Sequence, residues 1–110
     1  MTYHRVPRDL DHLRGCLAEG FPFTLGLSVH ESFESRGVSR TGRVPMPKEG
    51  ERILGGHAVL AVGYDARSRR FLLRNSWGPR WGEKGHFTLP WSYLMDPGLA
   101  WDFWTVRRVL

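Results

Sequence analysis

The sequence predicts an α+β domain in which a short helix is followed by an antiparallel, bent β-sheet. Apolar residues recur at helical spacing near the start of the chain, at Leu10, Leu13 and Leu17. Later apolar runs are short and are bounded by glycine, proline or charged residues, which is typical of strands. With 110 residues, 41% of them hydrophobic and 25% charged, the chain has the composition of one ordinary globular domain.

The first predicted element is a helix over residues 7–19. Asp9 and Asp11 lie in its first turn, where the helix dipole favours acidic groups, and Gly20 ends it. Cys16 lies at the edge of the apolar stripe. We expect a strand over residues 23–29 and then a short helical turn over residues 30–35 that docks Phe33 against the core.

Residues 36–54 are rich in glycine, proline and charge. This composition predicts a surface loop, with at most a short strand around Val38 or Val44.

A β-hairpin is predicted next, because two apolar runs, residues 55–65 and 71–78, flank a basic turn over residues 66–70. His57 opens the first strand and Asn75 closes the second. The outer ends of an antiparallel hairpin meet, so these two side chains should be neighbours.

The remainder of the chain alternates between glycine-rich and apolar segments. Residues 78–85 are predicted to form a glycine-punctuated loop, residues 86–89 a strand, residues 90–95 a helical turn and residues 100–106 a final strand.

Charge and composition disfavour several classes of protein. The sixteen basic residues exceed the eleven acidic ones and give a net charge of +5, but most are scattered, so we expect no nucleic-acid binding. No apolar run approaches the roughly 18 residues of a membrane span, and the N-terminus lacks the apolar centre of a signal peptide. We therefore expect no membrane partner, and the cellular location stays open.

The single cysteine, Cys16, excludes an intrachain disulfide and a cysteine-rich zinc site. We expect no metal and no cofactor.

Three motifs carry a resemblance to a known family. They are the strand His57–Asp65, the run Asn75-Ser76-Trp77-Gly78, and Trp81-Gly82-x-x-Gly85 followed by His86-Phe87. In this order and at this spacing the motifs resemble the C-terminal half of the papain family of cysteine peptidases. The resemblance implies that residues 1–110 form the C-terminal, β-rich subdomain of a papain-like peptidase domain.

The same resemblance implies roles for particular side chains. His57 would be the general base that deprotonates a cysteine thiol, and Asn75 would hold its imidazole in one tautomer. Trp77 would shield the contact between them from water, and Trp81 would border the leaving-group side of the cleft.

A substrate pocket is also implied, edged by Gly26, Gly55 and Ala58. All three residues are small, so we expect a roomy pocket that favours bulky apolar side chains. Trp91, Trp101 and Trp104 are interpreted as packing residues only.

The chain contains no segment like Gln-x-x-x-x-x-Cys-Gly-Ser-Cys-Trp, which in this family supplies the nucleophile and the oxyanion-hole side chain. Cys16 precedes His57 by about 40 residues, against roughly 130 to 150 in papain-like enzymes. It lies in mid-helix, away from the N-terminal dipole that lowers a thiol pKa. We interpret Cys16 as structural.

The expected function is thiol-dependent peptide-bond hydrolysis by a papain-like thiol protease. This chain would supply His57 and Asn75, and a separate nucleophile-bearing N-terminal half would be its partner, with peptides or proteins as substrate. The chain by itself is expected to be inactive, and to self-associate or be poorly soluble because of the apolar face that carries Trp77. The alternative is a non-catalytic papain-like domain that binds peptides or proteins, or a vestigial fragment.

Overall fold

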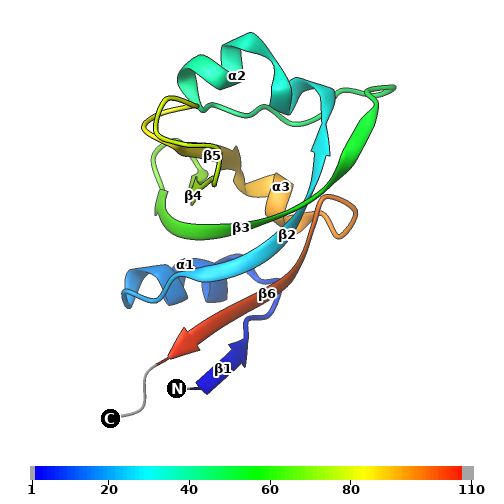
Figure 1. Ribbon diagram of the computed structural model, residues 1–110. Coiled ribbons are helices and arrows are strands. Elements are labelled where there is room, and N and C mark those ends of the chain that lie inside the picture. Colours follow the sequence, from blue (N-terminus) through cyan, green and yellow to red (C-terminus); the bar gives the residue numbers. More distant parts are fainter. Residues whose placement is uncertain (1, 108–110) are drawn as a thin grey trace.

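The computed structural model describes residues 2–107, and they form the predicted α+β fold around one six-stranded antiparallel sheet (Figure 1). The strands lie in the order β1-β6-β2-β3-β4-β5. Their bounds are β1 Thr2–Arg5, β2 Phe23–His30, β3 Ile53–Asp65, β4 Arg70–Arg74, β5 His86–Pro90 and β6 Ala100–Arg107. The helices are α1 Leu10–Ala18, the 3₁₀ turn η1 Glu31–Glu34, α2 Arg36–Thr41 and α3 Trp91–Met95. None of these helices is long and apolar enough to cross a membrane.

The core lies on one face of the sheet. In the paired strands β2 and β3, Phe23 lies opposite Ala61 and Leu25 opposite Val59, and all four are buried. Leu13 and Cys16 of α1 belong to the same buried cluster, so the helix is held by its apolar side. Burial of each large apolar side chain contributes about 1.5–3 kcal/mol.

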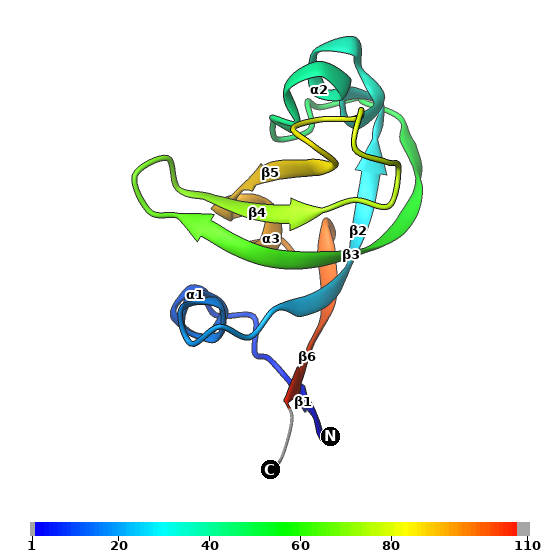
Figure 2. The same ribbon diagram turned by 60° about the vertical axis from the view of Figure 1, so that its left-hand side comes forward.

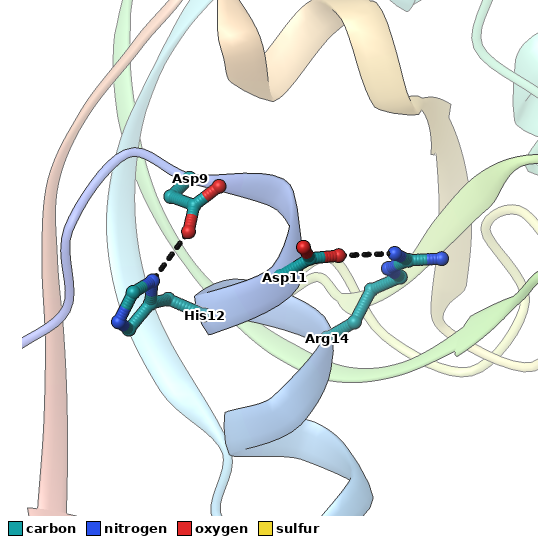
Figure 3. Close-up of polar contacts among 4 residues, drawn as sticks. All are labelled: Asp9, Asp11, His12 and Arg14. Carbon is teal, nitrogen blue, oxygen red and sulfur yellow. Dashed lines mark hydrogen bonds and ion pairs between the residues drawn. The ribbon is translucent and has the colours of Figure 1, made fainter.

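Helix α1 is shorter at its N-terminus than predicted. It begins at Leu10, because Asp9 has an extended backbone and occupies the N-cap position. His12 donates a hydrogen bond to Asp9, which lowers the pKa of that carboxyl, and Arg14 pairs with Asp11 (Figure 3). These pairs lie on the solvent side of the helix, where ion pairs contribute little to stability.

The segment predicted as a loop contains helix α2, and this part of the prediction was wrong. Ser35 caps the helix by accepting a hydrogen bond from the backbone N–H of Val38, and Gly42 ends it in a left-handed conformation. Val38 and Val44 are buried, so the segment packs against the core. A helix of six residues is too short to show apolar periodicity.

The predicted hairpin is confirmed as β3 and β4, and β3 bends strongly as it passes from the side of α2 to the hairpin turn (Figure 2). The predicted strands at residues 23–29, 86–89 and 100–106 agree with β2, β5 and β6 to within one residue. Strand β1 was not predicted. It pairs with β6, and this pairing sets the N-terminal strand beside the C-terminal one (Figure 1).

Candidate active site

His57 and Asn75 lie at the open end of the β3–β4 hairpin, where the sequence predicted that they would meet. His57 is in β3, and Asn75 directly follows β4. The His57 Nε2 atom is 2.9 Å from the Asn75 Oδ1 atom, a normal hydrogen bond. The backbone N–H of Asn75 donates to the carbonyl of Gly85 at 2.9 Å, which anchors the amide between the strand and the following loop.

The partners of the Asn75 amide define the tautomer of His57. Oδ1 also accepts a hydrogen bond from the backbone N–H of Ser76 at 2.8 Å, which fixes the orientation of the amide. A carbonyl oxygen only accepts, so His57 must donate through Nε2. The Nδ1 atom, which has no hydrogen-bond partner within residues 2–107, is then the basic nitrogen and is free to accept a proton.

Trp77 lies against the imidazole of His57. Their ring centroids are 5.5 Å apart, and the planes are tilted by 33°. The indole is 42% exposed, so one side of it faces outward while the other side covers the histidine. Asn75 itself is buried, and its hydrogen bond to His57 therefore meets little competition from solvent.

An aromatic cluster around Phe33 holds Trp77 in place. Phe33 of η1 is 1% exposed and contacts Trp77, Trp81 and Phe87 at centroid distances of 5.6, 5.6 and 5.0 Å. The predicted docking of Phe33 is thus confirmed. Trp81 stacks on Phe33 and packs against the core, so its position is fixed by this cluster.

A groove of about 460 Å³ adjoins His57. Gly26 and Ala58, two of the three small residues predicted to edge a substrate pocket, line it. The third, Gly55, is exposed and does not line the groove, whereas its neighbour Gly56 does.

Trp101 narrows this groove. The small residues at its edge had predicted a roomy pocket, so this part of the prediction differs from the structure. A Cβ atom on Gly26 would lie 2.3 Å from the Trp101 Nε1 atom, so the indole occupies the space that the glycine leaves. The register between β2 and β6 shifts between Thr24 and Gly26, and Asp102 there has a left-handed φ of 56°. Trp101 and Trp104 both line the groove, so they are not packing residues alone. The sequence did contain a signal for this contact, because a glycine in the interior of a strand often marks a place where another group comes close to the backbone.

A second groove, of about 760 Å³, lies beside Asn75 along the sheet face opposite the core. Its lining combines apolar side chains such as Ala58 and Leu60 with the basic residues Arg74 and Lys84. Among residues 2–107, no carboxylate lines this groove.

Cys16 lies apart from these grooves. Its thiol is buried in α1 and donates to the carbonyl oxygen of Phe21 at 3.2 Å. Within residues 2–107, the cavity that it lines shares no residue with the groove at His57 or with the groove beside Asn75. Residues 2–107 contain no cluster of three histidine, cysteine or acidic side chains that could hold a metal ion.

A bent antiparallel sheet that presents a histidine hydrogen-bonded to an asparagine is the arrangement that the resemblance to the papain family implied. The sequence model for the papain family cysteine proteases matches residues 2–93, and the chain belongs to this family.

Individual relatives agree. The chain is 45% identical over 100 residues to an uncharacterized peptidase C1-like protein of Acanthamoeba polyphaga mimivirus, covering 91% of this chain and 32% of the relative. It is 35% identical over 105 residues to cathepsin K of Gallus gallus, covering 89% of this chain and 29% of the relative.

Among solved structures, xylellain, a cysteine protease from Xylella fastidiosa, superimposes with a TM-score of 0.92 at 45% identity. The match covers all of this chain and 41% of xylellain. The chain therefore has a papain-like fold and spans less than half the length of these relatives.

Proposed function

We propose that this chain is the C-terminal, β-rich subdomain of a papain-like cysteine peptidase domain, with His57 as general base and Asn75 as the residue that orients it. The observation that carries the proposal is the 2.9 Å hydrogen bond between His57 Nε2 and Asn75 Oδ1, which leaves Nδ1 free. The contact between Trp77 and the imidazole supports it, because shielding from water strengthens that hydrogen bond.

In this mechanism the nucleophilic thiol comes from the N-terminal half of the domain. His57 Nδ1 takes the thiol proton, and the thiolate attacks the peptide carbonyl carbon. The imidazolium then gives its proton to the amide nitrogen as the C–N bond breaks, and a thioester remains. A water molecule, deprotonated by the same Nδ1, attacks the thioester and releases the acid, and the proton returns to the departing thiolate.

The nucleophile-bearing half would dock on the open sheet face beside Asn75. That face is partly apolar, and its basic residues Arg74 and Lys84 make no ion pair within residues 2–107. An apolar surface that carries scattered positive charge suits a partner with acidic groups at its rim.

Peptide substrates would lie across His57. Gly26 and Ala58 would edge the pocket for the side chain that precedes the scissile residue, whereas Gly55 lies outside the groove. Trp81 would border the leaving-group side. The lining of the 460 Å³ groove favours an apolar side chain there, and Trp101 limits its depth.

A chimera tests the proposal. The part of xylellain that this chain does not cover is joined to this chain, and hydrolysis of fluorogenic peptides is measured with and without a thiol-alkylating reagent. We expect thiol-dependent hydrolysis that His57→Ala abolishes and that Cys16→Ser leaves intact.

Two results would contradict this expectation. A folded chimera that hydrolyses no peptide would favour the non-catalytic, binding-module alternative. Loss of activity in Cys16→Ser, with the fold retained, would make Cys16 the nucleophile instead of a structural thiol.

A further inference from the structure

Arg70 carries a buried positive charge without a counter-charge. It is the first residue of β4 and is 7% exposed. Its Nε donates to the hydroxyl of Thr88 at 2.8 Å, and one Nη donates to the carbonyls of Thr88, at 2.9 Å, and Val44. All three acceptors are neutral, and no ion pair within residues 2–107 includes Arg70. A buried charge in such surroundings is costly unless it is compensated.

A second arginine lies close to it. The guanidinium of Arg43 makes no ion pair or hydrogen bond within residues 2–107. Burial, and then the positive charge of Arg43, lower the pKa of Arg70 to about 10, so Arg70 stays charged at neutral pH. Two like charges in one place favour the binding of an anion between them.

The space between them suits an anion. A cavity of about 370 Å³ is lined by both arginines, by the hydroxyl-bearing residues Ser35 and Thr41, and by residues of α2 and the segment after it. No carboxylate from the described part of the chain lines this cavity.

A neighbouring cavity of about 500 Å³ shares Arg43 and Arg70 but also contains Asp65 and Glu83. An anion would be repelled by these two carboxylates. The carboxylate-free cavity is therefore the favoured one of the two.

We propose that the cavity beside α2 binds a phosphate or sulfate group between Arg43 and Arg70. Guanidinium groups match the geometry of such oxyanions and form strong charge-assisted hydrogen bonds with them. The Ser35 hydroxyl already accepts from the N–H of Val38 but has no acceptor of its own within residues 2–107, so it can donate to the ligand. This site is separate from His57 and does not depend on the proposed peptidase function.

Titration of the 110-residue chain with inorganic phosphate tests the proposal, with sodium chloride of equal ionic strength as reference. Binding is followed by calorimetry and by the amide NMR signals of Gly37 and Val38. We expect saturable binding that Arg43→Gln weakens roughly tenfold, the loss of one charge-assisted contact. Arg40→Gln removes the same charge from an exposed position of α2 that lines neither cavity, and it should leave the affinity unchanged.

The outcomes separate clearly. No saturable binding, or equal weakening in the two variants, would overturn the proposal, because either result means that only general surface charge attracts the ion. Glycerol phosphate and sulfate, titrated in the same way, identify the ligand. Tighter binding of glycerol phosphate indicates a phosphate ester, and preference for inorganic phosphate or sulfate indicates the free ion.

Discussion

The two ends of the β3–β4 hairpin each hold a polar side chain among apolar neighbours, but in opposite ways. At the open end, His57 has one partner, the amide oxygen of Asn75, and keeps its second nitrogen free. At the turn end, the Arg70 Nε and one Nη donate to the neutral oxygens of Val44 and Thr88 and hold two segments together, while the other Nη makes no hydrogen bond within residues 2–107 and can serve the proposed anion. The free nitrogen of His57 suits chemistry, and the donors that Arg70 already uses suit stability. Mutations at the two ends should therefore affect different properties.

The largest expected effect is on activity at the open end. In the xylellain chimera, His57→Ala should lower kcat/KM by roughly 10³-fold or more, because the thiol loses its general base. The free energy of urea unfolding should change by less than about 1 kcal/mol, since the imidazole is only partly buried. If His57→Ala lowered the free energy of unfolding as well as the activity, the proposed difference between the two ends of the hairpin would be wrong.

Asn75→Ala should lower kcat/KM less, by roughly 10²-fold, because His57 would lose its fixed orientation. A positioning role also predicts that the loss falls on kcat with KM nearly unchanged, since peptide binding does not require the imidazole to be oriented. Separate measurement of kcat and KM checks this. A loss that falls on KM alone would reduce Asn75 to a structural residue.

At the turn end, Arg70→Met should lower the free energy of unfolding by roughly 1–3 kcal/mol, because the Val44 carbonyl loses the side-chain donor that it has in a buried site. Urea denaturation measures the effect. The kcat/KM of the folded chimera should stay unchanged, with Arg69→Met, in the exposed turn, as the matched control. A fall in kcat/KM without loss of stability would show that the two ends are coupled.

The smallest effect concerns Glu51, which supports the open end through η1. Hydrogen bonds from Ser32 and from the backbone N–H of Lys48 lower the pKa of its carboxyl to about 2. A folded-state pKa below the unfolded one stabilises the protein above pH 4.5, and this contribution is lost as the pH falls towards 2.

Comparison of Tm at pH 6 and pH 3 measures this contribution. Glu51→Gln should show a smaller drop in Tm than the unmodified chain. Glu49→Gln, which changes an exposed carboxyl nearby, should show the same drop as the unmodified chain. Equal drops in Tm in all three proteins would show that the Glu51 carboxylate does not stabilise the open end.

The open end was predictable from the sequence and the turn end was not. The apolar runs on both sides of a basic turn defined the hairpin, and hairpin geometry alone brought His57 and Asn75 together. Arg70 follows Arg67 and Arg69 in the sequence, and such a basic run is usually solvated. Its burial depends on Val44 and Thr88, which are distant in the chain. Strand β1 escaped prediction for a similar reason, because Thr2–Arg5 is polar and pairs only with β6.

The close packing of Gly26 against Trp101 should be visible when homologous sequences are aligned. Any side chain at position 26 would collide with the indole, so the glycine can change only after, or together with, a smaller residue at position 101. Across homologous proteins we therefore expect these two positions to covary, with larger residues at one accompanied by smaller residues at the other. The two residues would change as a pair, although they lie 75 positions apart in the sequence.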